Sequence, residues 1–322
     1  MDSAIFEDCY NAYKNDFYDG KGWSDLAIIY GYVSGDALRS SFKRERKKRG
    51  LPSKNELNQP EVLLKTEKVF PKILCFDCEL SLMRGYFFDL WEQNIRPEQI
   101  ISDTFLISWS AKYLNEAKIY SNVLTPEEAK SGNDERAIRN IWNLLNDSNI
   151  LIGQNIKFFD LKKLNVRFLH YGMPPIGNKQ IIDTYIIAKN NFSFPSNSLK
   201  YINKFLGIKQ KEENEGISLW IKAMDGDQKS LKIMNDYCEN DTMITEDLYF
   251  KLLPFIHGGV NLAIYYDGNE KRCPNCGSTD LKEESFEYRN MGKYASYRCE
   301  CGSIIRSKEN LLDKDKRKSL LV

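Results

Sequence analysis

The chain has 322 residues, of which 42% are hydrophobic and 28% charged, and a formal net charge of +1 at pH 7. This length accommodates one sizeable domain with smaller appendages, and the composition is that of an ordinary soluble protein. No stretch approaches the roughly 18 consecutive apolar residues of a membrane span, and the acidic start MDSAIFEDCYNAYKND lacks an apolar signal core. The sequence therefore predicts a cytoplasmic protein without a membrane partner, in which any nucleic-acid-binding surface is local.

Residues 1–58 are predicted to form a small helical unit. The stretch GWSDLAIIYGYVSGDALRSSFKRERKKRG predicts a short helix capped by Ser24, a turn around Gly31 to Gly35, and a second helix from about Asp36. A short helix, a turn containing glycine and a second helix that runs into basic residues are typical of a helix-turn-helix.

The second predicted helix runs into a strongly basic stretch. Between Arg39 and Lys54, eight Lys or Arg residues stand against one acid, Glu45, which gives a local charge of +7. We expect this edge to contact the phosphates of a nucleic acid. The residues expected to do so are Arg44, Lys47, Lys48 and Arg49. The alternative is a solvated helix end followed by a linker.

Residues 68–258 alternate strand-like and helix-like segments. Apolar runs predict strands at residues 72–80, 84–91, 100–110, 117–124 and 149–155. Helical spacing of apolar residues predicts helices at residues 133–147, with Asn133 as a cap, and at residues 158–172. This α/β order with an early run of consecutive strands predicts a mixed sheet flanked by helices.

Two carboxylates interrupt the first of these apolar runs, KILCFDCELS. On a strand, Asp77 and Glu79 point to the same face, about 6.5 to 7 Å apart along the chain. Burying two like charges side by side costs several kcal/mol unless a positive group neutralises them. A hard divalent cation such as Mg²⁺ takes carboxylate ligands and is suited to phosphodiester hydrolysis.

Further oxygen ligands have candidates elsewhere in the chain. Asp160 enters a predicted helix in ILIGQNIKFFDLKKL, with Asn155 five residues before it. Asp241 lies in NDYCENDTMITEDLY, with Tyr237 four residues earlier, so that the two share one helix face. A tyrosine hydroxyl in that place is able to orient an attacking water molecule.

FDCE, GQNIKFFD and YCEND together resemble the three motifs of DEDD-type 3′–5′ exonucleases, in the ribonuclease-H-like superfamily. The motifs stand in order, with 83 residues from Asp77 to Asp160 and 81 more to Asp241. The resemblance covers about residues 70–255, and residues 107–112 and 181–208 are similar to the branch related to family B DNA polymerase exonuclease domains. Neither histidine of the chain, His170 or His257, stands just before Asp241, so the resemblance is to the tyrosine subtype.

This resemblance implies a catalytic site with two Mg²⁺ or Mn²⁺ ions. The implied metal ligands are Asp77, Glu79, Asp160 and Asp241. Tyr237 would help to position the attacking water, and Asn155 either contacts the substrate backbone or orders its loop. The expected function is 3′–5′ exonuclease activity on nucleic acid, with DNA favoured over RNA.

Residues 268–308 are polar and rich in cysteine and glycine. Four thiolates stand on two tight turns, at Cys273, Cys276, Cys299 and Cys301. This spacing predicts a closed tetrahedral Zn²⁺ site of structural type and resembles a zinc ribbon, although a single residue between Cys299 and Cys301 is fewer than usual. Residues 309–322 are predicted to be a flexible tail.

Two other functions fit parts of this pattern. A RuvC-like endonuclease also combines basic helices, carboxylates and a zinc ribbon, but its ribbon usually precedes the last acidic residue, whereas here it follows Asp241. A nucleic-acid-binding protein with an exonuclease-like scaffold would be marked by lost carboxylates, and all four are present.

Overall fold

The computed structural model describes residues 1–14, 22–51, 70–89, 91, 94–208 and 215–321. The chain forms two compact units, Met1–Glu67 and Lys68–Val322. The carboxylates and the four cysteines singled out in the sequence all lie in the second unit. No helix in the described part of the chain has the length and apolar character needed to cross a bilayer.

The described part of the first unit is helical. Its helices are α1 (Ser3–Lys14), α2 (Trp23–Ile29) and α3 (Gly35–Lys48). Leu38 and Phe42 lie one turn apart on α3 and are buried with Phe6 of α1 and Leu26 of α2. Ser34 caps α3, because its hydroxyl accepts a hydrogen bond from the backbone N–H of Ala37 at 3.2 Å.

The cap predicted for the preceding helix is wrong. Helix α2 begins at Trp23, so that Ser24 lies inside the first turn, and Gly22 occupies the N-cap position. The carboxylate of Asp25 accepts a hydrogen bond from the N–H of Gly22 at 2.7 Å. The side chain of Asp25, in the first turn, therefore makes the hydrogen bond at the helix start that was expected of Ser24.

The second unit is built on a five-stranded mixed sheet of order β5-β4-β1-β6-β7. The strands are β1 (Ile73–Leu80), β4 (Leu106–Tyr113), β5 (Ile119–Val123), β6 (Ile150–Gly153) and β7 (Gln180–Asp183). Strand β4 runs antiparallel to β1 and β5, whereas β6 runs parallel to β1 and β7. The prediction of a mixed sheet flanked by helices is confirmed.

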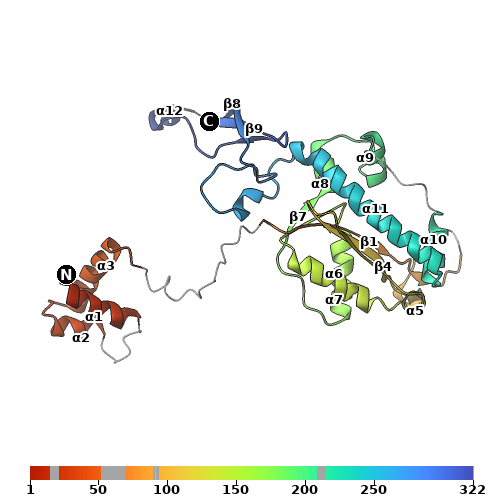
Figure 1. The fold of residues 1–322 in the computed structure, drawn as a ribbon, viewed down its shortest axis with the longest axis horizontal. Coiled ribbons are helices and arrows are strands. Elements are labelled where there is room, and N and C mark those ends of the chain that lie inside the picture. The colour runs from red at the N-terminus through yellow and green to blue at the C-terminus, as the bar shows by residue number, and fades with distance from the viewer. Residues whose placement is uncertain (15–21, 52–69, 90, 92–93, 209–214, 322) are drawn as a thin grey trace. The chain divides into compact units, whose positions relative to one another are not determined.

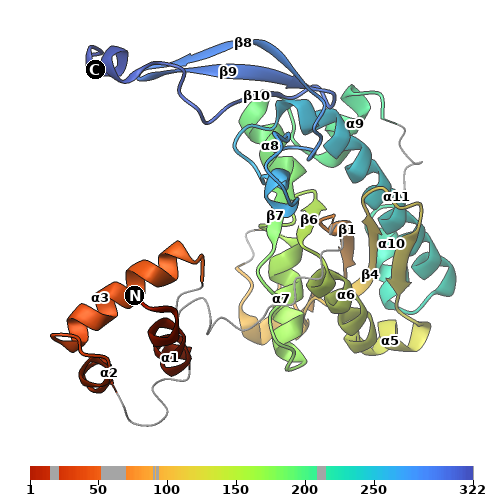
Figure 2. The ribbon, with the colours of Figure 1, turned by 60° about the vertical axis from the view of Figure 1, so that its left-hand side comes forward.

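Helices cover both faces of this sheet (Figures 1 and 2). They are α5 (Pro126–Ser131), α6 (Glu135–Asp147), α7 (Asp160–His170), α8 (Thr184–Asn191), α9 (Leu199–Phe205), α10 (Ile217–Met224) and α11 (Gln228–Leu252). The long helix α11 lies on one face, and α6 and α7 lie on the other (Figure 1). Phe76 of β1 is buried with Leu164 of α7, whereas Cys75 is buried with Tyr249 of α11. Alternate residues of β1 therefore face opposite helix layers.

Several predicted boundaries differ from the structure. The strand predicted at residues 100–110 is divided into β3 (Ile100–Ser102) and β4, with residues 103–105 in neither. Among the described residues of the strand predicted at residues 84–91, only β2 (Arg84–Gly85) forms, paired with β3. Phe88 beyond it is 98% exposed, so the described part of the chain provides no layer that covers it. Helix α6 begins at Glu135 after Asp134, although Asn133 still accepts a hydrogen bond from the N–H of Glu135 at 3.2 Å.

A small antiparallel sheet of order β10-β9-β8 follows α11 in the chain. Its strands are β8 (Leu281–Arg289), β9 (Gly292–Cys299) and β10 (Ile304–Arg306). Asn275 joins it to the end of α11, because its amide donates hydrogen bonds to the carbonyl oxygens of Leu253 and Ile256. The remaining short helices are η1 (Pro97–Gln99), η2 (Leu253–Phe255), η3 (Leu262–Tyr265) and α12 (Lys314–Lys318).

Candidate metal-dependent active site

Strand β1 and helix α11 bring three carboxylates together. Asp77 and Glu79 lie on the face of β1 that α11 covers, as their alternation with buried Phe76 and Cys78 requires. Each of Asp77, Glu79 and Asp241 offers a carboxylate oxygen, and these oxygens lie within 4.8 Å of one another. Residues 164 positions apart in the sequence thus form one acidic cluster.

Asp160 lies close to this cluster but outside its tightest group. It is the first residue of α7 and is only 5% exposed. Its charge acts on both Asp77 and Glu79 and raises the pKa of each carboxyl. The two carboxylates of β1, Asp160 at the start of α7 and Asp241 in the middle of α11 therefore lie near one another.

Burial and mutual repulsion disfavour charge on these carboxyls when no cation is present. Burial, followed by the charges of Glu79, Asp160 and Asp241, raises the pKa of Asp77 well above its ordinary range. Burial and the charge of Asp241 raise the pKa of Glu79 to about 8, and burial raises that of Asp160 to about 7. The described ion pairs include none between a Lys or Arg and Asp77, Glu79 or Asp160. Carboxylate oxygens from Asp77, Glu79, Asp160 and Asp241 are the kind of donor that hard divalent cations prefer.

Tyr237 stands one turn before Asp241 on α11. Its hydroxyl and the carboxylate of Asp241 form a hydrogen bond. Burial and the charges of Asp241, Glu79 and Asp77 raise the pKa of Tyr237 above its ordinary value, so the phenol keeps its proton at physiological pH. A protonated phenol at the edge of the cluster is a hydrogen-bond donor for a water molecule or a phosphate oxygen.

The loop that leads into Asp160 is held by Asp183 and Thr184, a pair that the sequence suggests as structural hydrogen-bonding groups. Asn155 has a left-handed backbone (φ 61°), and its N–H donates to the carboxylate of Asp183 at 2.9 Å. The hydroxyl of Thr184 donates to the carbonyl of Gly153 at 3.2 Å and to the side chain of Gln154 at 2.5 Å. The Asp-Thr pair at the start of α8 therefore orders the loop before Asp160, and only the fold brings the two segments together.

The four cysteines form a second cluster at the base of the small sheet. Their sulfurs lie within 4.8 Å of one another, with Cys273 and Cys301 3.8 Å apart and Cys276 and Cys299 3.5 Å apart. All eight cysteines of the chain are free thiols. The hydrogen bond with Cys276 lowers the pKa of the Cys273 thiol to about 5. Four convergent sulfurs fit a tetrahedral Zn²⁺ ion.

Glycine is needed in the turn that follows Cys276. Gly277 has a positive φ of 78°, and a Cβ atom there would lie 2.5 Å from the ring of Tyr266. Its N–H donates to the carbonyl of Cys273 at 2.8 Å, which closes the turn around the sulfurs. The glycine after each second cysteine is therefore part of the site's geometry.

The basic residues expected to contact phosphates lie on α3, in the first unit. Arg44, Lys47 and Lys48 are exposed there and form no ion pair with a described residue. Arg49 differs from them, because its guanidinium lies 4.0 Å from the centre of the Phe6 ring and pairs with Glu7 and Glu45. These contacts favour a structural role for Arg49.

A comparison with protein families agrees with this architecture. Residues 86–253 match the family model of the RNase H superfamily, a range that includes Asp160, Tyr237 and Asp241 and begins after β1. The chain is also similar to the family B DNA polymerase of the hyperthermophilic archaeon Pyrobaculum calidifontis, at 20% identity and a TM-score of 0.43. That similarity covers 57% of this chain and 25% of the polymerase chain. Among curated proteins, no sequence matches this one. Because the matched range spans more than half of the 322 residues, the chain belongs to the RNase H superfamily.

Proposed function

We propose that this protein is a metal-dependent 3′–5′ exonuclease that hydrolyses phosphodiester bonds of nucleic acid, preferentially DNA. Membership of the RNase H superfamily supports nuclease activity in general. The observation that carries the proposal is the convergence of Asp77, Glu79 and Asp241 within 4.8 Å, with Tyr237 one turn from Asp241. The three motifs that resemble the tyrosine-type exonucleases supply the direction of cleavage.

In this proposal the carboxylates hold two Mg²⁺ or Mn²⁺ ions. The ligands would be Asp77, Glu79, Asp160 and Asp241. Divalent cations bound there supply a Lewis acid for phosphodiester hydrolysis. The Tyr237 hydroxyl orients the attacking water, and Asn155, fixed by Asp183, presents its side chain to the substrate backbone.

The reaction consumes one water molecule for each nucleotide released. The water oxygen bonds to phosphorus, the bond between phosphorus and the 3′ oxygen breaks, and that oxygen leaves with a proton. The product is a nucleoside 5′-monophosphate, and the shortened strand keeps a 3′ hydroxyl. Among the described residues no Lys or Arg forms an ion pair with Asp77 or Glu79, so we expect the site to depend on added metal.

The basic face of α3 and the small sheet would help to hold the substrate. Arg44, Lys47 and Lys48 are free to meet phosphates. In the small sheet, Lys293 lies 3.8 Å from the centre of the Phe286 ring, which is 44% exposed, so charge and a stacking surface occur together. The cysteine cluster would hold this sheet through Zn²⁺ as a structural ion.

The direct test is digestion of single-stranded DNA and RNA labelled at the 3′ or the 5′ end, with Mg²⁺ or Mn²⁺ and with EDTA as control. The proposal predicts early release of labelled mononucleotide from the 3′ end, with DNA cut faster than RNA. Internal fragments would instead identify an endonuclease, and binding without cleavage would identify a binding protein on a nuclease-like scaffold.

A further inference from the structure

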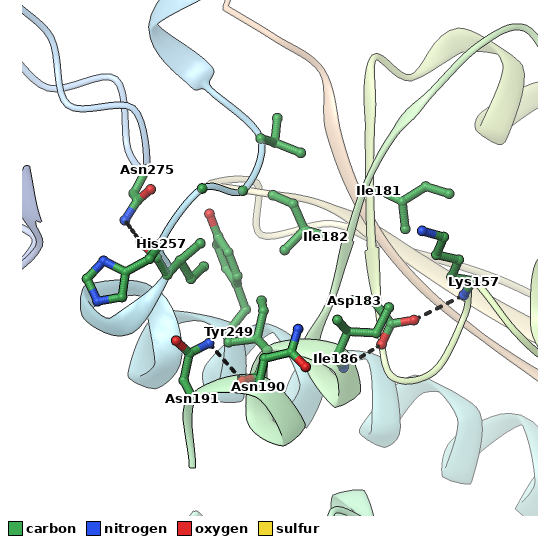
Figure 3. Close-up of a pocket in the computed structure, with 15 residues that line it drawn as sticks. Lys157, Ile181, Ile182, Asp183, Ile186, Asn190, Asn191, Tyr249, His257 and Asn275 are labelled. Carbon is green, nitrogen blue, oxygen red and sulfur yellow. Dashed lines mark hydrogen bonds between the residues drawn. The ribbon is translucent and has the colours of Figure 1, made fainter. Parts of the chain in front are cut away.

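We propose that a pocket beside the edge strand β7 is a nucleotide site that binds a nucleoside monophosphate, separate from the carboxylate cluster. The pocket has a volume of about 270 Å³ and lies between β7, α8 and the segment that follows α11 (Figure 3). Dedicated sites for drug-sized ligands enclose about 300–1,000 Å³, so this cavity suits a somewhat smaller molecule.

Much of the pocket's lining is aliphatic. It includes Ile182 of β7, Ile186 of α8, Ile256 and Val260. Tyr249 of α11 adds an aromatic ring (Figure 3). Apolar side chains of this kind pack against the faces of a flat ring, as they do around an unstacked base.

Polar groups stand at one end of the pocket, where Figure 3 shows His257 and Asn275. The amide nitrogen of Asn275 is used by the carbonyls of Leu253 and Ile256, whereas its oxygen has no partner among the described residues. The imidazole of His257 and the amide of Asn190 likewise have no hydrogen-bond partner in the described part of the chain. Free hydrogen-bonding groups of this kind match the donors and acceptors on the edge of a nucleobase.

The other end of the pocket carries one available cation. Lys157 forms no ion pair with a described residue, and its ammonium lies 6.0 Å from the centre of the Phe158 ring. The carboxylate of Asp183 is already occupied, because it accepts backbone N–H groups that include those of Asn155, Lys157 and Tyr185. The hydrogen-bond acceptors of Asp183 are therefore used within the protein, and the ammonium of Lys157 is the group in the pocket lining that can pair with a single phosphate group.

The position of Lys157 connects the pocket with the proposed reaction. Lys157 lies on the loop that leads into Asp160, three residues before it. A nucleoside monophosphate is the product of the proposed exonuclease. The inference rests on the proposed function for the source of this ligand, and the binding itself depends only on the pocket.

The test uses the full-length protein with its carboxylate cluster disabled by Asp77→Asn and Asp241→Asn. Isothermal titration calorimetry without added divalent metal, with dAMP, dTMP or AMP as probe, is expected to show one site with a Kd between about 10 µM and 1 mM. Inorganic phosphate alone is expected to bind at least about tenfold more weakly, since it lacks the ring.

Two added substitutions locate the site. Ile186→Trp fills the cavity and is expected to abolish binding, whereas Val166→Trp, on an exposed part of α7, leaves it unchanged. Lys157→Gln is expected to weaken nucleotide binding about fivefold or more through the lost phosphate contact. Absence of binding, binding that survives Ile186→Trp, or equal affinity for inorganic phosphate would overturn the inference. Because the cluster is disabled, none of these results decides whether the protein is a nuclease.

Discussion

Replacing one carboxylate of the acidic cluster by an amide is expected to abolish metal binding without preventing folding. Asp77→Asn and Asp241→Asn both keep the shape of the side chain. Asp241→Asn removes a charge that raises the pKa of Asp77 and of Glu79, and Asp77→Asn removes a charge that raises the pKa of Tyr237. We expect cleavage to fall by about 10³-fold or more, whereas the melting temperature without metal stays equal or rises because repulsion is relieved. Steady-state cleavage and thermal unfolding check both parts. The assignment fails if either variant turns over substrate at the wild-type rate.

Substitution of Tyr237 is expected to lower the cleavage rate less than substitution of a carboxylate. Tyr237→Phe removes the hydroxyl that bonds to Asp241 and keeps the ring. We expect kcat to fall about 10-fold to 100-fold with little change in nucleic-acid affinity, because the hydroxyl orients water and does not hold metal. A matched control is Tyr113→Phe, a half-buried tyrosine of β4 away from the cluster. Equal losses in the two variants would argue for a general packing effect.

Periodicity accounts for what could be predicted at the scale of residues. Asp77 and Glu79 share a face because a strand alternates, and Tyr237 and Asp241 share one because a helix repeats every 3.6 residues. The support that Asp183 gives to Asn155 follows no local repeat. It arises from strands paired in the sheet, and the sequence alone does not specify such contacts.

At the scale of elements, helix α3 is expected to supply the salt-dependent part of nucleic-acid binding. Replacing Arg44, Lys47 and Lys48 by Ala removes three exposed cations without touching the buried Leu38 and Phe42. The slope of log K against log salt for duplex DNA should fall by about 0.9 for each lost phosphate contact. Arg49→Ala is the control, and it should lower thermal stability through its lost contacts with Phe6 and Glu7. An unchanged salt slope in the triple variant would exclude phosphate contact by α3.

The small sheet is expected to depend on its metal. Cys276→Ser removes one of four convergent sulfurs. We expect loss of one equivalent of zinc and faster proteolysis within residues 270–306, because so small a sheet has little core of its own. Cys9→Ser, in the first unit, is the control and should leave the zinc content unchanged. Equal zinc content in the two variants, measured by mass spectrometry of the metal, would contradict the site.

The elements also show where local pattern fails. Residues 84–91 have the composition of a strand, yet pairing ends at Gly85 and the aromatic side chains beyond it are exposed. An apolar run is buried only if the fold supplies a second layer. By contrast, β1 and α11 are predicted correctly because each is covered by the core on at least one face.

For the molecule as a whole, the stability of the metal-free protein should depend on pH. The pKa of Glu79 rises from 4.5 to about 8 and that of Asp160 from 3.8 to about 7. Between these values the folded chain holds more protons than the unfolded chain, so its free energy of unfolding falls as pH rises from about 5 to 8. Mn²⁺ at pH 8 should restore stability, because it binds the folded state.

Thermal unfolding of the wild type and Glu79→Gln over this pH range checks the effect. Without metal, the melting temperature of the variant should depend less on pH than that of the wild type. Mn²⁺ should also raise the melting temperature of the variant less. A metal-free melting temperature that rises from pH 5 to 8, in parallel in both proteins, would refute the proposed origin of the shift.

At the same scale, the sequence predicted the order of the parts but not their contacts. The order of the motifs can be read directly along the chain. The hydrogen bonds of Asn275 with Leu253 and Ile256, by contrast, require the small sheet to pack on the end of α11. The nuclease-like part and the small sheet accordingly lie in one compact unit, Lys68–Val322. The pocket lined by Tyr249 and His257 arises at this contact and has no signature in the sequence.

The central claim is that carboxylates from β1, α7 and α11 hold divalent cations. Anomalous diffraction from crystals soaked in Mn²⁺ tests it most directly. The account predicts manganese bound between the oxygens of Asp77, Glu79 and Asp241, and loss of that signal in Asp241→Asn. Well-ordered carboxylates without manganese between them, or manganese bound only elsewhere, would contradict it.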